Sequence, residues 1–164
     1  MKQFLNTELV NNEPITDYLE VVVHMFPLPY HHNAFFVTIL VPLIYDYTNH
    51  SADKVFKYME FMLKNQAEFL PAKSYDLNEE EVKNKICAST SHLEIISYDE
   101  CLKGINDMKY FTEAKSMWKY AAYNSIDGTP EILLNGIQVD APYTITEWRA
   151  MLQGHLGEID TGEI

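Results

Sequence analysis

Asn135-Gly136 lies between two short apolar runs, and this arrangement constrains the fold more than any other local feature. Residues 131–134 precede the pair and residues 137–139 follow it. Asn-Gly favours the tight type I′ turn, because both central residues of that turn need positive φ and its twist matches that of two paired strands. The sequence therefore predicts a β-hairpin over residues 131–139.

A last helix is expected after the hairpin. Thr144 or Thr146 can serve as its N-cap, and Gly154 would end it. Residues 154–164 then form an acidic C-terminal tail that offers little to bury. The apolar face of the helix would carry Trp148, Met151 and Leu152.

The beginning of the chain predicts a helix and then a strand. Phe4, Leu5 and Leu9 fall at helical spacing within residues 4–10. Residues 18–26 are rich in β-branched side chains and almost continuously apolar, which is typical of a strand buried on both faces.

The middle of the chain predicts helices alone. Asn33 can cap a helix over residues 34–47, with a kink at Pro42. Another helix is expected to begin near Ser51, because five apolar residues then share one face: Val55, Tyr58, Met59, Met62 and Leu63.

Two capping boxes predict the helices that come next. Asn78 with Glu81, and Ser97 with Glu100, have the spacing of an N-cap and its third helical residue. A further helix would end before Gly128. Its apolar face would carry Met117, Trp118, Ala121 and Ala122.

Two segments, one on each side of this helical middle, carry a family resemblance. Residues 26–35, Phe-Pro-Leu-Pro-Tyr-His-His-Asn-Ala-Phe, are similar to the segment that leaves the second strand in DsbA-like thioredoxin-fold proteins. Residues 128–136, Gly-Thr-Pro-Glu-Ile-Leu-Leu-Asn-Gly, resemble that family's cis-proline loop and hairpin. The resemblance covers about residues 1–153. It implies a single α/β domain, a thioredoxin-like fold with a helical insertion at about residues 34–126, between the second strand and the C-terminal hairpin and helix.

The resemblance implies a binding role for Thr129 and Pro130. In that family the peptide bond before this proline is cis, and the loop backbone pairs with an extended protein substrate. Cis peptide bonds are essentially a proline feature, so the residue types agree. An ordinary trans Thr-Pro bond that opens a strand is the alternative.

The resemblance also implies a first strand and a C-x-x-C motif ahead of the first helix, and the sequence is expected to lack both. No catalytic residue is therefore assigned. That strand is central in a thioredoxin fold, so its loss would leave two strand edges unpaired. We expect either a shortened form of a longer product, or a protein partner or rearranged segment that completes the sheet.

The two cysteines, Cys87 and Cys101, lie within predicted helices and are 14 positions apart. Thiol-disulfide exchange needs a thiolate at a helix N-terminus and a second thiol one turn away. We expect both cysteines to be reduced core residues, because free cysteine is among the most buried residue types. A helix-to-helix disulfide and a single reactive thiol are the alternatives.

The charge of the chain limits its partners. With 24 acidic and 12 basic residues, the formal charge of −12 disfavours nucleic acid and anionic membranes. The longest apolar run, residues 34–45, contains Pro42 and is too short for a bilayer, so no transmembrane segment is expected. The family resemblance favours an oxidising or organellar compartment, whereas no signal peptide opens the sequence, and the compartment stays open.

The remaining patterns indicate neither a metal nor a cofactor. His24, His31 and His32 have no cysteine or acidic partner at ligand spacing, so no metal is expected. Residues 79–81 are three glutamates that suit the first turn of a helix. Phosphate-loop, dinucleotide and hydrolase motifs are missing. Four aromatic residues of the insertion are candidates for core packing or for a protein-binding surface: Tyr45, Tyr47, Tyr58 and Phe61.

Taken with these patterns, the resemblance implies a non-catalytic, redox-inactive thioredoxin-fold protein. It would act as a protein-binding module or as a structural subunit of a larger assembly. The alternative is a thiol-disulfide oxidoreductase or isomerase whose C-x-x-C segment is absent from this sequence. A glutathione-dependent enzyme fits less well, because the helices interrupt the thioredoxin-like part instead of following it.

Overall fold

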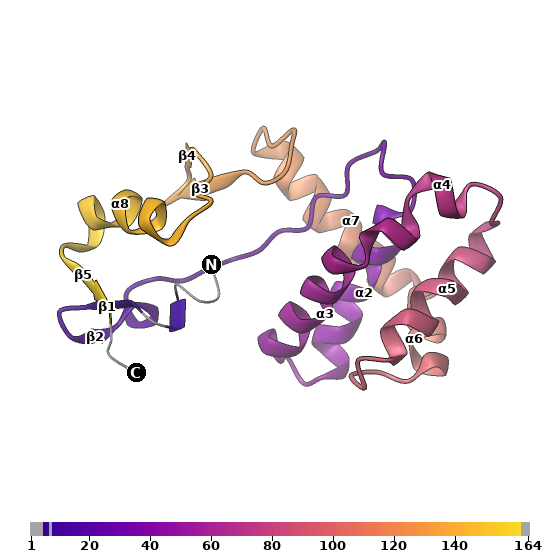
Figure 1. Ribbon diagram of the computed structural model, residues 1–164. Helices are drawn as coiled ribbons and strands as arrows, with labels where there is room; N and C mark the ends of the chain where they lie inside the picture. Colours follow the sequence, from indigo (N-terminus) through magenta and orange to yellow (C-terminus); the bar gives the residue numbers. More distant parts are fainter. Residues whose placement is uncertain (1–4, 7, 162–164) are drawn as a thin grey trace. The chain divides into compact units, whose positions relative to one another are not determined.

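The chain divides into two units, each with its own core (Figure 1). The structure, a computed structural model, describes residues 5–6 and 8–161. One unit joins Met1–Val23 to Thr129–Ile164, and the other is His24–Gly128. The first is a mixed α/β unit and the second is helical.

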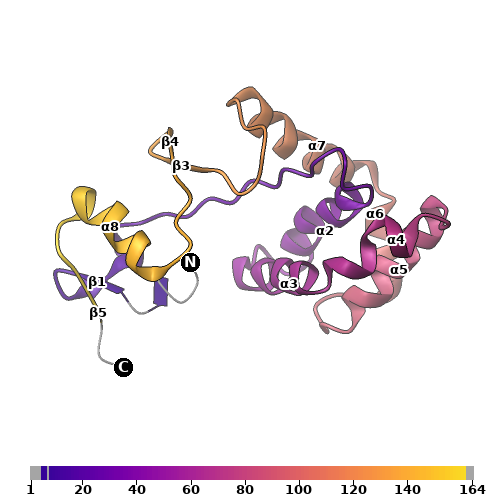
Figure 2. The same cartoon turned by 45° about the horizontal axis from the view of Figure 1, so that its top comes forward.

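The helical unit contains the insertion that was expected at about residues 34–126. The central helix is α2, which contacts α3, α5, α6 and α7 (Figure 2). Its nearly continuous apolar sequence suits burial on several sides. The elements are α2 (Ala34–Tyr47), α3 (Ala52–Lys64), η2 (Gln66–Phe69), α4 (Pro71–Ser74), α5 (Glu79–Ser91), α6 (Tyr98–Ile105) and α7 (Met108–Tyr123).

The helices begin where their caps predicted. Asn78 and Glu81 form both bonds of a capping box at α5, and the Ser97 hydroxyl accepts from the Glu100 amide at α6. Asn33 stands before α2 as expected, but its side chain makes no capping bond. The Asn33 amide is buried and donates instead to Ser74 Oγ, at 2.7 Å, because α4 packs over this position.

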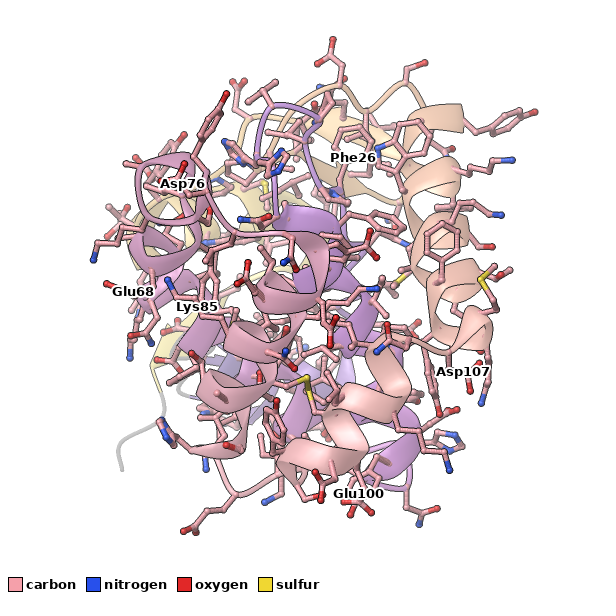
Figure 3. All side chains as sticks on the ribbon, turned by 90° about the vertical axis from the view of Figure 1, so that its right-hand side faces the viewer. Phe26, Glu68, Asp76, Lys85, Glu100 and Asp107 are labelled. Carbon is pink, nitrogen blue, oxygen red and sulfur yellow. A yellow bond between two sulfur atoms is a disulfide. The ribbon has the colours of Figure 1, made fainter. Side chains whose placement is uncertain are left out.

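A disulfide joins Cys87 of α5 to Cys101 of α6 (Figure 3). The prediction that both are reduced core residues was therefore wrong about their chemistry, although both are fully buried. The packing of α5 on α6 brings the two Cα atoms to 5.6 Å, within the range that a disulfide spans. Sequence separation alone does not reveal this pairing, because it results from the angle between two helices.

The α/β unit contains two small antiparallel sheets. In one sheet the order is β2-β1-β5, and the other is the hairpin β3-β4. Helix α8 shares an apolar cluster with residues of both sheets, including Val10, Ile132 and Ile159. The elements are β1 (Glu8–Val10), β2 (Glu13–Pro14), η1 (Ile15–Asp17), β3 (Ile132–Leu134), β4 (Ile137–Val139), α8 (Ile145–Leu156) and β5 (Ile159–Thr161).

Both ends of the chain differ from the sequence-based expectation. The helix expected over residues 4–10 gives way at Glu8–Val10 to β1, which pairs with β5; Phe4 and Thr7 lie outside the described residues. Helix α8 continues past Gly154 to Leu156 and stops at Gly157, whose φ is 88°. The expected acidic tail therefore supplies a strand, because burying Ile159 beside Val10 outweighs local preference.

The strand expected over residues 18–26 is also absent. Residues 19–28 carry no helix, strand, turn or bend. The pattern correctly identifies an apolar, β-branched segment, but a strand needs the hydrogen-bond ladder of a neighbour. No described segment supplies that ladder.

We predict opposite effects for alanine at two helical glycines. A Cβ at Gly104 of α6 would overlap the buried Leu43 side chain, whose Cγ would lie 2.9 Å away, whereas a Cβ at Gly154 of α8 meets nothing within 4 Å. Gly104→Ala should lower the free energy of unfolding of the helical unit by roughly 1–3 kcal/mol. Gly154→Ala should stabilise α8 by about 0.5–1 kcal/mol. Hydrogen exchange resolved to each helix measures both; destabilisation by both substitutions would contradict the packing.

Removal of the disulfide should loosen the helical unit. We expect Cys87→Ser/Cys101→Ser to lower its free energy of unfolding by about 3 kcal/mol, because the bond closes a short loop in the unfolded chain. Denaturant-dependent hydrogen exchange at α5 and α6 measures the loss. Refolding with a reductant should move the wild-type chain toward the variant and leave the variant unchanged. Two titratable thiols in native protein purified without reductant would contradict the bond.

Candidate functional site

The peptide bond between Thr129 and Pro130 is cis, and both residues are exposed. This confirms the cis geometry expected at the loop. Pro130 lies two positions before β3, so the loop leads directly into the hairpin. The binding role of these two residues stays a prediction.

The hairpin forms as the Asn-Gly pair predicted. Asn135 and Gly136 have φ values of 49° and 85°, the positive pair that a type I′ turn needs. Leu134 pairs with Ile137, and Leu133 pairs with Gln138. The turn places the loop residues Thr129 and Pro130 at the open end of the hairpin, away from its tip.

One face of the hairpin is fixed on helix α8. Ile132 and Leu134 pack in the cluster that contains the buried side chains of Trp148 and Leu152. The start of α8 is held by a capping box, in which the Glu147 carboxylate accepts from the Thr144 amide at 2.9 Å. Helix α8, fixed at its start by these bonds, therefore supports the inward-facing side chains of β3.

The same capping contacts affect the charge of Glu147. Its carboxylate accepts from the backbone N–H groups of Tyr143 and Thr144, which lowers the pKa of Glu147 below its ordinary 4.5. A lowered folded-state pKa means that this contribution to stability is present above pH 4.5 and is lost as the pH falls further.

A buried ion pair holds β1 against α8. Arg149 Nη2 donates to Glu8 Oε1 at 2.7 Å, and Nε donates to the other carboxylate oxygen. Glu8 is only 2% exposed, so its charge depends on the guanidinium for stabilisation. Sequence analysis missed this pair, because its members lie 141 positions apart and no local pattern connects them.

The outer edge of β3 is open. Next to a two-residue turn, Leu134 and Ile137 form a hydrogen-bonded pair, and such pairs alternate with non-bonded ones along an antiparallel ladder. The N–H and C=O of Leu133 therefore point away from β4. No other strand of residues 5–6 and 8–161 pairs with this side of β3, which we call the open edge.

A second length of backbone in the same unit is also unpaired. Residues 20–23, which we call the open segment, form no backbone hydrogen bond within the described parts of the chain. Val22 and Val23 are 64% and 42% exposed, which is unusual for adjacent β-branched residues. Leu19, just before them, packs on the cluster that also receives Ile132 of β3. The open edge and the open segment thus border one apolar cluster.

His24 and His31 of the helical unit contact aromatic rings. His24 stacks on Tyr120 with centroids 4.6 Å apart, and His31 meets Tyr30 edge to face. In the described residues, no three His, Cys, Asp or Glu side chains lie together in an arrangement that could hold a metal ion. These histidines therefore contribute ring contacts.

A small apolar hollow lies where α2 begins. Phe26, labelled in Figure 3, stacks on Trp118 of α7 with centroids 6.0 Å apart. The hollow has a volume of about 210 Å³. Its lining comprises Pro27, Leu28, Pro29, His31, His32, Phe35 and Trp118.

The four aromatic candidates of the insertion divide between core and surface. Tyr58 is fully buried and donates to the Val37 carbonyl at 2.8 Å, and this burial raises the pKa of its phenol. Phe61 is partly buried. Tyr45 and Tyr47 are exposed, and the Tyr47 hydroxyl donates to Glu100, which raises the pKa of Tyr47. They do not form one continuous aromatic surface.

Comparison of the chain with protein-family models, curated proteins and solved structures found no match. Among the helices that the structure describes, none combines the length and the apolar character needed to cross a bilayer. The candidate site is therefore argued from its own geometry: a cis-proline loop, an open edge and an open segment.

We predict that Arg149→Gln destabilises the α/β unit by about 3 kcal/mol, because it leaves the buried Glu8 carboxylate without its charged partner. Glu8→Gln/Arg149→Gln should recover a large part of that loss, since two neutral amides can bond to each other. Urea denaturation followed by Trp148 fluorescence in a Trp118→Phe background measures both variants. If the single variant matched the wild type, the pair would not support β1 on α8.

Proposed function

We propose that this chain is a non-catalytic, DsbA-like thioredoxin-fold protein that binds an extended segment of a protein partner, alone or as a subunit of a larger assembly. The observation that carries the proposal is the open edge at Leu133, beside the exposed cis-proline loop. An exposed strand edge offers unpaired N–H and C=O groups to an added strand. Thr129 and Pro130 would form one end of this binding surface.

The order of elements supports the thioredoxin-like part of the proposal. A cis-proline, a two-stranded hairpin and a last helix follow one another in the α/β unit, and the helical unit is inserted before them. In a thioredoxin fold one further strand lies between the second strand and this hairpin. The open segment and the open edge are the two places that such a strand would join.

Typical interaction energies indicate which contacts would supply most of the binding free energy of the partner segment. Leu133 offers one donor and one acceptor, and a net 0.5–1.5 kcal/mol per bond makes this pairing worth roughly 1–3 kcal/mol. Most of the binding free energy must then come from covering apolar side chains, such as Val22 and Val23. The partner segment should therefore have β-branched or aromatic residues at alternate positions.

The chain contains no thiol for the alternative, a thiol-disulfide oxidoreductase or isomerase. Cys87 and Cys101, its two cysteines, are joined to each other and are buried. Catalysis would require a C-x-x-C segment outside residues 1–164. Such a segment would bring its own strand, which could fill the same gap.

The proposal is tested with a peptide of alternating Val and Thr, about seven residues long, as an ordinary strand is, with neutral Ser-Asn flanks. It is titrated to about 1 mM into the full chain labelled with ¹⁵N, a range that detects weak binding. We expect amide shifts and slowed hydrogen exchange at residues 129–134, because pairing protects the outward N–H of Leu133.

Two proline variants provide a matched pair. Leu133→Pro removes the outward N–H of β3, and Gln138→Pro removes the equivalent outward N–H of its cross-strand partner on β4. Binding should be lost in the first variant and retained in the second. Equal binding to both variants, shifts confined to residues 24–128, or no shifts at all would overturn the proposal.

A further inference from the structure

The negative charge of the chain is concentrated in the α/β unit. Met1–Val23 and Thr129–Ile164 hold ten Asp and Glu and two Lys and Arg, a difference of −8. The whole chain has −12, so the longer helical unit carries only the remaining −4. The unit with the unpaired backbone is therefore the one with the strong negative field.

Several of these acids border the proposed binding surface. Glu20 stands at the start of the open segment and is exposed. Glu131 immediately precedes β3, and Asp140 immediately follows β4 and is exposed. Because Ile132 pairs with Val139, Glu131 and Asp140 lie together at the open end of the hairpin, where one flank of an added strand would lie.

The described part of the unit offers little positive charge to balance them. Arg149 is bonded to Glu8 through both its Nε and Nη2 atoms. Lys2, the other basic residue, lies outside the described residues. With both bases counted, the unit keeps its excess of −8, which favours a partner of the opposite sign.

A second copy of this chain is a poor occupant of the open edge. Antiparallel pairing of β3 with β3 of another copy would bring two units of −8 together and place like charges across the ladder. Phosphate-bearing partners meet the same repulsion. Charge complementarity points to a protein segment of the opposite sign.

We infer that the occupant of the open edge is a strand of a basic protein, with Lys or Arg beside an apolar, β-branched core. This inference rests on the proposed function, because it names the partner of the same surface. The apolar core covers the open segment and the apolar cluster, and a basic flank lies near Glu131 and Asp140 at the open end of the hairpin. Glu20, at the start of the open segment, adds to the same negative field. The charges add selectivity and speed of association more than affinity.

Solvent exposure limits how much the basic flanks can change the dissociation constant. Exposed ion pairs are individually weak, so two or three of them should change the dissociation constant by about tenfold. Screening over a Debye length of about 3 Å at 1 M salt, against about 10 Å at 0.1 M, should remove most of this difference. The pairing of backbone groups should survive the added salt.

The test compares three peptides that share the Val-Thr core and differ only in flanks of Lys, Ser or Glu. At low salt we expect the Lys-flanked peptide to bind the full chain about tenfold more tightly than the Ser-flanked one, with the Glu-flanked peptide weakest. At about 1 M salt the three should converge. If the Ser-flanked peptide still protects the Leu133 N–H from exchange, equal affinities at low salt or tighter binding of the Glu-flanked peptide would overturn the inference and leave the proposed function standing.

Two double variants, each removing two negative charges, test which acids produce the preference for Lys-flanked peptides. Glu20→Gln/Asp140→Asn removes two exposed acids of the α/β unit, one at the start of the open segment and one just after β4, and should abolish most of the preference for Lys. Asp76→Asn/Glu80→Gln removes two exposed acids of the helical unit and should leave the preference intact. An equal loss in both variants would assign the effect to net charge and overturn the inference. Self-association abolished by Leu133→Pro would overturn it in favour of a second copy. Failure of every peptide to protect Leu133 would count against the proposed function itself.

Discussion

The ion pair between Glu8 and Arg149 is the interaction on which the α/β unit depends. It holds β1, near the beginning of the chain, on α8, near its end. Because the Glu8 carboxylate is shielded from water, the unit cannot release the guanidinium without leaving a buried charge. By joining β1 to α8, the pair connects two elements that both contribute to the apolar cluster on which β3 packs.

The elements that were predicted correctly are those stabilised by residues close together in the sequence. Asn135-Gly136 predicted the hairpin, and the pairs Asn78 with Glu81 and Ser97 with Glu100 predicted two helix starts. In each case the residues that carry the pattern make the bonds that stabilise the element. The cis bond before Pro130 was expected from the family resemblance, and it agrees with the fact that cis peptide bonds are essentially a proline feature. The bond is present.

The features that escaped prediction depend on partners distant in the sequence. Strand β1 exists because β5 pairs with it, whereas no segment among residues 5–6 and 8–161 pairs with residues 18–26, which form no strand. The Cys87–Cys101 bond requires the packing of two helices to be known. For the candidate site, the cis geometry of the loop could be predicted, whereas the open edge and its support required the three-dimensional arrangement.

An edge that accepts a strand also carries a hazard, because it can template fibrous aggregation. Proteins commonly guard such edges with charged residues, and Glu131 and Asp140 flank this hairpin in the manner of gatekeepers. The colloidal behaviour of the chain should thus depend on the same carboxylates that would recognise its partner.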